Sequence, residues 1–369
     1  MHVRSTWFAV IALAALAASA SGADWGLKPG APELKSAGPL AFGPDGILVV
    51  GDVKAATLFA IDTGDAEGDP AGVDLTVDRL NEQIADLLGV SPSEVTINDL
   101  AVNPASGNVY VSVSAGTAPE DKPALVRVGA GGELAALPLD NIPFAKVELP
   151  NPPADREVGQ GNRRRNLRME SITDLAYISG RVIVSGASDA IASSTIRAVP
   201  FPFMTADAGA NLEIYHGAHG ALEDNATPRV FVPFSIDGEP SLLAGFTCTP
   251  LVRFSLGELE PEAKVRGTTV AELGNRNRPL DMIVYEKGGA TWLLLANNNR
   301  GVMKISTEDI GEQEAITEPV PDGESAGQPY ETIEELTGIV QLDKLNATHA
   351  IVLAQAESGA QDLRTIELP

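Results

Sequence analysis

Short apolar segments separated by tight turns recur along this chain, and each of the clearest pairs begins with an aspartate. Asp99, Asp174 and Asp281 each open a segment of this kind; residues 99–104 lead into 108–113, 174–180 into 181–185, and 281–285 into 291–296. A unit of several short strands repeated along a chain is typical of a β-propeller. The pattern therefore predicts an all-β fold in a single domain.

Six blades of four strands account for the pattern, counted from strand A at the centre to strand D outside. The predicted strands are 38–42, 47–50, 57–61 and 73–77; 100–103, 109–113, 124–128 and 133–137; 172–178, 181–185, 195–199 and 211–215; 229–235, 241–246, 251–255 and 268–273; 281–285, 291–296, 301–306 and about 315–319; and 338–342, 350–354 and 363–368. A short helix at 78–89 interrupts the repeat, with apolar residues at helical spacing before Gly89. The proline-rich stretch 143–153 is predicted to extend the outer edge of blade two.

The sixth blade lacks a fourth strand in the pattern. We predict that residues 25–34 supply it, because such closure ties both ends of the chain into one ring and removes an exposed edge. The alternative is a seven-bladed ring, in which 73–98 or 143–168 contains a degenerate blade.

The N-terminus has the pattern of a secretory signal peptide. Arg4 precedes an apolar run at 7–18, and the small residues at 18–20 form a cleavage site, with 21–23 as the next choice. We therefore expect a signal peptide at 1–20, a propeller domain at 24–369, and a secreted or periplasmic protein. No later stretch approaches the ~20 apolar residues of a transmembrane helix.

The net charge of −24 disfavours nucleic acid as a partner. Cys248 is the single cysteine, so no intramolecular disulfide can form. We expect a monomer stabilised by packing and ring closure.

Arginines gather in loops that a propeller places at one face. The loops from strand D to the next strand A, and from B to C, share that face and are long here. They carry Arg163, Arg164, Arg165, Arg168, Arg276, Arg278 and Arg300, with Asn298 beside the last. Because guanidinium groups suit carboxylate and phosphate, these residues predict a mouth that binds a small anionic molecule or an acidic protein segment. The alternative is that the arginines pair with nearby carboxylates and pin the loops.

Histidine and cysteine meet in two neighbouring loops of the same face. His216 and His219 lie between blades three and four, and Cys248 lies in the next loop, within blade four. Imidazole and thiolate are soft donors that suit copper or zinc. The alternative is a Cys248 that packs like a small apolar residue and histidines that bond to the loop backbone.

Acidic residues lie near the starts of the predicted inner strands, where side chains can converge on the axis. Asp99, Glu170, Asp174 and Asp281 offer the oxygen ligands that calcium prefers. The alternative is that each aspartate caps its own turn.

The Asp-Leu-Ala and Gly-x-Val/Ile patterns resemble the six-bladed propellers of the NHL, YWTD and gluconolactonase/senescence-marker-protein kind. The resemblance implies the fold. For the gluconolactonase-like propellers it also implies a divalent cation held on the axis by carboxylate and amide groups, and lactone hydrolysis.

Two classes of function remain open, because propellers serve both. One is an exported binding module whose mouth holds a ligand, with a bound metal. The other is a metal-dependent enzyme at the same face, either a copper or zinc oxidoreductase or a calcium-dependent lactonase-like hydrolase. No Gly-x-Ser-x-Gly or Walker motif occurs, and no catalytic residue is identified.

Overall fold

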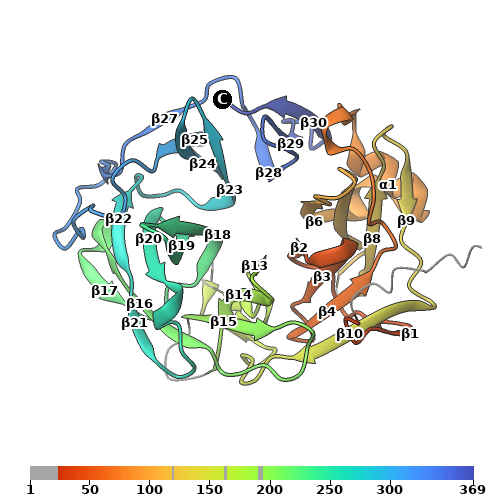
Figure 1. Ribbon diagram of the computed structural model, residues 1–369, viewed down its shortest axis with the longest axis horizontal. Coiled ribbons are helices and arrows are strands. Elements are labelled where there is room, and N and C mark those ends of the chain that lie inside the picture. The colour runs from red at the N-terminus through yellow and green to blue at the C-terminus, as the bar shows by residue number, and fades with distance from the viewer. Residues whose placement is uncertain (1–23, 119, 162–163, 190–193) are drawn as a thin grey trace, which may run out of the picture.

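Six sheets, antiparallel except where β21 joins β16, stand like blades around a central channel (Figure 1). The computed structural model describes residues 24–118, 120–161, 164–189 and 194–369. The predicted six-bladed β-propeller is confirmed, and helix α1 (Leu80–Leu88) lies within the predicted helical segment. The predicted signal peptide lies outside the described residues.

We number the blades by the order in which their inner strands occur in the chain. Blade I contains β2 (Leu40–Phe42), β3 (Ile47–Asp52), β4 (Thr57–Asp62) and β10 (Ile142–Glu148), with β1 (Lys28–Gly30) outside; blade II contains β6 (Val95–Val102), β7 (Val109–Ala115), β8 (Lys122–Val128) and β9 (Leu134–Ala136); blade III contains β13 (Asp174–Ile178), β14 (Arg181–Ala187), β15 (Ser194–Pro200) and β16 (Ala210–His216), flanked by β17 (Ala221–Glu223) and β21 (Lys264–Arg266).

The remaining blades follow the same plan. Blade IV contains β18 (Pro228–Ile236), β19 (Glu239–Phe246), β20 (Pro250–Ser255) and β22 (Thr268–Glu272), with β26 (Ala326–Gly327) outside; blade V contains β23 (Pro279–Lys287), β24 (Ala290–Asn297), β25 (Gly301–Ser306) and β27 (Tyr330–Thr332); blade VI contains β28 (Ile339–Lys344), β29 (His349–Gln355), β30 (Gln361–Glu367) and β5 (Thr76–Val77). A small hairpin of β11 (Glu157–Val158) and β12 (Arg165–Asn166) precedes blade III.

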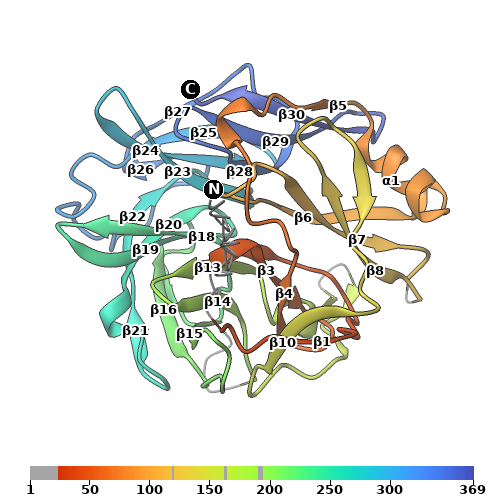
Figure 2. The ribbon, with the colours of Figure 1, turned by 45° about the vertical axis from the view of Figure 1, so that its right-hand side comes forward.

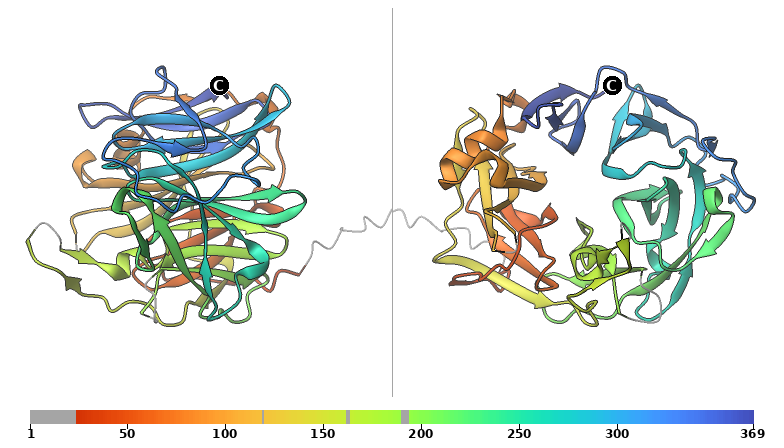
Figure 3. Two further views of the ribbon diagram at one scale, coloured as in Figure 1. Left: turned by 90° about the vertical axis from the view of Figure 1, so that its left-hand side faces the viewer. Right: turned by 180° about the vertical axis from the view of Figure 1, so that it is seen from behind.

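The blades do not follow one another around the ring in chain order. Inner strand β2 contacts β6 on one side and β13 on the other, and β6 contacts β28. The order around the ring is therefore I, II, VI, V, IV, III. The chain steps from blade I to blade II, returns past the outside of blade I, and runs through blades III to VI in the opposite direction (Figures 1 and 3).

This order explains two outer strands that the sequence analysis assigned wrongly. The returning chain leaves β10 on the outside of blade I, paired with β4, so the stretch at 143–153 does not extend blade two. The first crossing leaves β5 on the outside of blade VI, paired with β30 (Figure 2). The ring is thus closed by β5 and not by residues 25–34, whose strand β1 adds a fifth strand to blade I.

Two further expectations are corrected. The outer strand of blade V is β27, not the segment at 315–319. The seven-blade alternative is wrong because 73–98 and 143–168 contribute outer strands and helix α1 to the six blades instead of a blade of their own.

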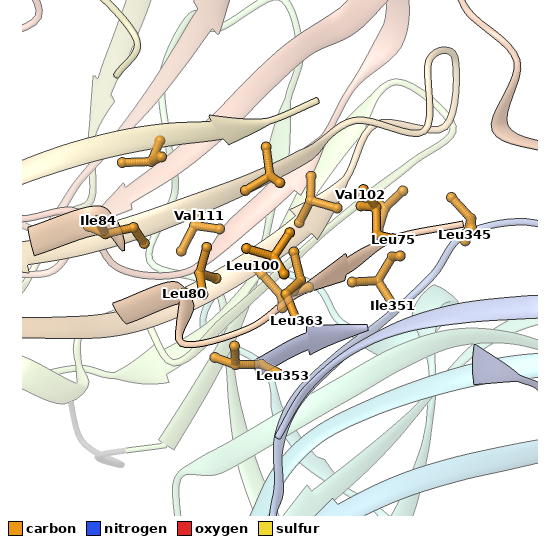
Figure 4. Packing of buried hydrophobic residues seen from close by; sticks show 14 of the residues in the cluster. Leu75, Leu80, Ile84, Leu100, Val102, Val111, Leu345, Ile351, Leu353 and Leu363 are labelled. Carbon is orange, nitrogen blue, oxygen red and sulfur yellow. The ribbon is translucent and has the colours of Figure 1, made fainter. Parts of the chain in front are cut away.

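Helix α1 covers the junction of blades II and VI. Leu80 and Ile84 are fully buried and belong to one cluster with Val111, Leu353 and Leu363 (Figure 4). Full burial of a side chain of this size contributes about 2 kcal/mol. The helix ends at Gly89, whose backbone is left-handed at φ 70°, a conformation that favours glycine.

The recurring aspartates join neighbouring blades. One carboxylate oxygen of each accepts a hydrogen bond from an inner strand of the next blade: Asp99 from the Leu40 amide, Asp174 from Phe231, Asp281 from Leu342 and Asp343 from Val102, at 2.6–2.8 Å. The other oxygen accepts from the amide of the following residue. We call these four residues the aspartate belt. These hydrogen bonds join blade III to IV, V to VI, VI to II and II to I. Each of these pairs consists of blades that are neighbours in the ring.

Candidate functional site

The inner strands all begin at one face of the ring, here called the upper face, and end at the lower face. The loops from D to A and from B to C therefore lie on the upper face, as the sequence analysis expected. His216 ends β16, His219 lies in the single turn Gly217–His219, and Cys248 lies between β19 and β20. All three come from blades III and IV, which are neighbours in the ring.

The predicted convergence of His216, His219 and Cys248 is confirmed. One nitrogen of each imidazole and the Cys248 sulfur lie within 4.8 Å of one another. The two imidazole rings are 3.8 Å apart between centroids. Bonds of about 2.0–2.3 Å to a shared ion place the donor atoms roughly 3–4 Å apart, so the three donors would need a small adjustment to hold a metal.

Glu223 orients both imidazoles. The turn after His216 returns as β17, whose pairing with β16 brings Glu223 alongside. Its carboxylate oxygens lie 2.9 Å from Nδ1 of His216 and 2.6 Å from Nδ1 of His219. A carboxylate that accepts from Nδ1–H leaves Nε2 unprotonated, which is the tautomer that a metal needs. Nε2 of His216 is buried and has no hydrogen-bond partner in the described part of the chain.

The protonation states also suit a metal. Burial is the largest influence on His216 and lowers its pKa, although Glu223 acts in the opposite direction. His216 is therefore neutral at pH 7. Burial alone raises the pKa of Glu223, but the hydrogen bonds from His216 and His219 outweigh it, and the net pKa is below the ordinary value. Glu223 is therefore ionised.

Cys248 is held by a strained turn. Cys248 and Thr249 are successive non-glycine residues in the left-handed region, at φ 66° and 60°. Such conformations cost roughly 1–3 kcal/mol each and concentrate at functional sites. The Cys248 amide donates to the carbonyl of Asn277 at 2.7 Å, and the Thr249 hydroxyl donates to the carbonyl of Gly274 at 2.6 Å. These bonds fix the turn.

Glu272 supports the histidine loop and was missed by the sequence analysis. It is buried, and one oxygen accepts from the Gly217 amide at 2.5 Å, while the other has no partner among the described residues. Burial raises its pKa to about 7. A Cβ at position 217 would lie 2.9 Å from Cγ of Glu272, so this close approach requires glycine.

The three donors do not enclose the site. The His216 side chain is 3% exposed, whereas that of His219 is 50% exposed and Cys248 is half-buried. Closed four-ligand sites are typical of structural metals, and sites with an open position are typical of exchangeable or catalytic metals. The His216, His219 and Cys248 donors leave an open position of this kind.

A cavity of about 350 Å³ opens at the centre of the upper face, and we call it the upper cavity. Its charged lining consists of three cations, Lys54, Arg229 and Arg278, and four carboxylates, Asp99, Asp121, Asp174 and Asp281. Lys54 pairs with Asp121 at 3.0 Å, and Arg229 pairs with Glu170 at 3.2 Å. The guanidinium of Arg278 has no ion pair with a described residue, and its pKa is lowered by partial burial and by Arg229.

The predicted arginine mouth is present only in part. Arg163 lies outside the described residues. Four of the others contact loop residues. Arg164 pairs with Glu157 at 3.6 Å and Arg276 with Asp322 at 2.8 Å, while Arg168 donates to the carbonyl of Pro153 and Arg300 to that of Asn275. Arg165 is exposed on β12. Asn298 accepts from the Arg278 amide at 2.7 Å. Only Arg278 of the predicted set lines the upper cavity, where Lys54 and Arg229 were missed.

The predicted calcium ligands have structural partners. Glu170 pairs with Arg229. One oxygen of each belt aspartate accepts the amide of the following residue, as the alternative expected, whereas the other accepts an amide from a neighbouring blade, which was not expected. Desolvation raises the pKa of Asp174 to about 7, of Asp343 to about 6, and of Asp99 and Asp281 well above the ordinary value. Calcium binding by these residues stays a prediction.

Comparisons with known proteins show no family for this chain. The sequence matches no protein-family model and no curated protein. The PQQ-bound aldose sugar dehydrogenase from Streptomyces coelicolor is 12% identical, with a TM-score of 0.33 over 92% of this chain and 96% of that chain. An engineered GH43 glycoside hydrolase is 11% identical, with a TM-score of 0.37 over 75% and 51%. The plexin A4 extracellular region is 10% identical, with a TM-score of 0.41 over 92% and 46%.

No helix among the described residues is both long and apolar enough to cross a membrane.

Proposed function

We propose that this protein is an exported metal-binding propeller that holds a copper or zinc ion at His216, His219 and Cys248. The observation that carries the proposal is the spacing of the three donor atoms, which lie within 4.8 Å of one another. Two nitrogen donors and one sulfur donor favour these soft or borderline ions over calcium.

Glu223, Cys248 and Glu272 have separate roles in this metal site. Glu223 holds both imidazoles by Nδ1 and directs Nε2 toward an incoming ion. Cys248 binds as the thiolate, so binding releases its proton and affinity falls as pH is lowered. Glu272 anchors the loop through the Gly217 amide. The open side leaves room for a further ligand such as water.

This arrangement supports a binding role first and an enzymatic role second. An open coordination position is also what a metal-dependent oxidoreductase needs. Binding requires only the donor set, whereas catalysis further requires a substrate site beside it. We therefore propose the binding role and keep the metal-dependent enzyme as the alternative.

Metal binding is tested on the purified chain 24–369 by metal analysis and competition titration with Zn²⁺ and Cu²⁺. We expect one equivalent in the wild type, and a loss of at least tenfold in affinity in Cys248→Ser and His219→Gln. His349→Gln is the matched control, because His349 contacts Thr348 outside the site. Equal affinity in Cys248→Ser and the control, with unchanged melting temperatures, would overturn the proposal.

A second candidate function is the binding of a small anion in the upper cavity. It is favoured by Arg278, whose guanidinium lines that cavity without an ion pair to a described residue. Citrate and inorganic phosphate are suitable probes in calorimetry. We expect Arg278→Ala to abolish binding and Arg164→Ala, which removes an exposed arginine of the hairpin, to leave it unchanged. Equal binding in both variants would exclude this site.

A further inference from the structure

The lower end of the channel contains a second cavity of about 850 Å³, which we call the lower cavity. It is lined by the second halves of the inner strands of all six blades. Small-molecule sites in proteins typically have volumes of ~300–1,000 Å³. The lower cavity therefore has the size of a ligand site, on the face opposite the metal centre.

The lower cavity has apolar walls below the aspartate belt. They are half-buried side chains from four blades, among them Phe42, Tyr177, Pro233 and Val284. Both aromatic rings are fixed from behind, because Phe42 makes an edge contact with Tyr110 at 5.2 Å between centroids and Tyr177 makes one with Phe201 at 6.2 Å. The walls are thus preformed for the body of an apolar or aromatic molecule.

The charged groups of the lower cavity are mainly carboxylates. The four belt aspartates lie at its inner end and Asp69 lies on its rim, against Lys344 as the one cation of the lining. None of these five carboxylates forms an ion pair with a described residue, although the charge of Lys344 acts on the neighbouring Asp343. A lining of this sign selects a cation and disfavours an anion.

The belt carboxylates are accessible from the channel. All four are half-buried, and an oxygen that accepts one backbone amide keeps a lone pair for a second donor. Desolvation is the largest influence that raises the pKa of Asp99 and Asp281, and neighbouring belt carboxylates raise it further. The belt carboxylates therefore repel one another across the channel, and a bound cation relieves that repulsion.

We propose that the lower cavity binds a small organic cation, an amine whose protonated nitrogen faces the aspartate belt and whose apolar or aromatic body packs against Phe42 and Tyr177. An ammonium group donates to the free lone pairs of carboxylates and is also attracted to the faces of aromatic rings. No residue of the lower cavity belongs to the metal centre, so the proposal stands independently of the proposed metal binding.

The test compares three probes that share one ring and differ in charge: benzylamine, benzyl alcohol and benzoate. Calorimetry of the folded chain 24–369 at about pH 7.5 should give saturable binding of one benzylamine. Benzyl alcohol should bind at least fivefold more weakly and benzoate should not bind, because only the amine carries the charge that the lining selects. EDTA in the buffer removes any metal, so the result does not depend on the metal site.

Two substitutions at the exposed rim locate the amine by their opposite signs. Asp69→Asn removes a negative charge but keeps a side-chain oxygen to cap the turn through the Ala71 amide. We expect it to weaken benzylamine about threefold, and Lys344→Gln, which removes the rim cation, to tighten it about threefold. Neither should change the affinity for benzyl alcohol by more than twofold. Tyr177→Leu should weaken both probes, since both use the aromatic wall.

The controls make the same charge changes elsewhere. Asp121→Asn is the control for Asp69→Asn and also tests the upper cavity, because Asp121 lines the upper cavity and not the lower one. This distinction is needed because Asp99, Asp174 and Asp281 line both cavities. Lys122→Gln, at an exposed position on β8 outside both cavities, is the control for Lys344→Gln. Both controls should bind benzylamine within twofold of the wild type.

Four results would overturn the proposal. They are the absence of saturable benzylamine binding, equal affinity for benzylamine and benzyl alcohol, binding of benzoate at least as tight as that of the amine, and rim substitutions with effects no larger than those of their controls. Weakening by Asp121→Asn but not by Asp69→Asn would place the amine in the upper cavity and would likewise contradict the assignment. Unchanged melting temperatures verify that the variants are folded.

Discussion

Asp99 of blade II accepts a hydrogen bond from the backbone amide of Leu40 in blade I at 2.7 Å, across 59 residues of the chain. The bond points backwards along the chain, from blade II to blade I. In the other direction around the ring, blade I meets blade III. A side chain that recurs in the repeat therefore marks a blade order that differs from the chain order.

Removal of a belt carboxylate should destabilise the ring. Asp343→Ala leaves the Val102 and Lys344 amides without their acceptors, and a buried amide without a partner costs roughly 1–3 kcal/mol. We expect a fall of a few kcal/mol in the free energy of unfolding in urea. Asp86→Ala, on the exposed side of α1, is the control and should change it by less than about 0.5 kcal/mol. Similar stability in both variants would show that the belt bonds do not hold the blades.

The belt also predicts how stability depends on pH. The folded-state pKa of Asp174 is raised to about 7, above the value of about 3.9 in the unfolded chain. A raised pKa contributes stability that is complete below the unfolded value and is lost as pH rises through the folded value. The free energy of unfolding should therefore fall as pH rises from about 4 to about 7. Glu272, with a pKa raised to about 7, acts with the same sign.

The groups with lowered pKa act with the opposite sign, and their effect is confined to pH values below about 6.5. The pKa values of Glu223, Glu213 and His216 are lowered, so their contributions are complete above the unfolded values and are lost only on acidification. Asp174→Asn removes one titrating group and should make the slope of stability against pH less steep between about pH 4 and 7 than in the wild type, whose other titrating groups the variant keeps. An unchanged slope would contradict the assignment.

Glu223→Gln should weaken metal binding while the fold is kept. The amide cannot orient both imidazoles as the carboxylate does, and loss of such a partner typically reduces metal affinity about 10–100-fold. Competition titration measures the effect. Glu213→Gln is the control, because Glu213 lies on β16, the strand that pairs with β17, but forms ion pairs with Lys264 and Arg266. If the two variants bind metal equally well, Glu223 does not orient the ligands.

Gly217→Ala should displace the histidine loop. The added Cβ would lie 2.9 Å from Cγ of Glu272 and 3.0 Å from its carboxylate oxygen, and overpacking of this kind costs about 1–3 kcal/mol. We expect a lower melting temperature and weaker metal binding. Gly257→Ala, where the nearest atom is 3.7 Å away, should change neither.

The ring should survive loss of its N-terminal strand. A chain that begins at Lys35 lacks β1, the fifth strand of blade I, but keeps the closing strand β5. We expect it to unfold cooperatively with a modestly lower melting temperature. Val77→Asp places a charge at a buried position of β5 and should lower the melting temperature more. If the truncated chain had the lower melting temperature of the two, the ring would be closed by the N-terminal segment and not by β5.

The amino-acid pattern predicted most of the strands and the three residues that meet at the candidate metal site. Apolar alternation between turn residues is a local signal, so the predicted strand at 251–255 matches β20 at Pro250–Ser255. The loops that carry His216 and Cys248 belong to blades III and IV, which are adjacent in the chain and also in the ring. Their meeting therefore required only the propeller topology. Glu223 could also have been proposed as a partner of His216 from the sequence, because it is a carboxylate only seven residues further along the chain.

The blade that each outer strand joins depends on the three-dimensional arrangement of the blades. The two residues of β5 pair with β30, and Val77 lies 286 positions before its partner Leu363 in the chain. Nothing local to β5 specifies that partner. An outer strand contributes backbone hydrogen bonds and a few apolar contacts, which several blade edges can accept equally well. The same reason explains the arginines: sequence placed them on one face, but the spacing of carboxylates in three dimensions decided that Arg164 and Arg276 form ion pairs and Arg278 remains without one.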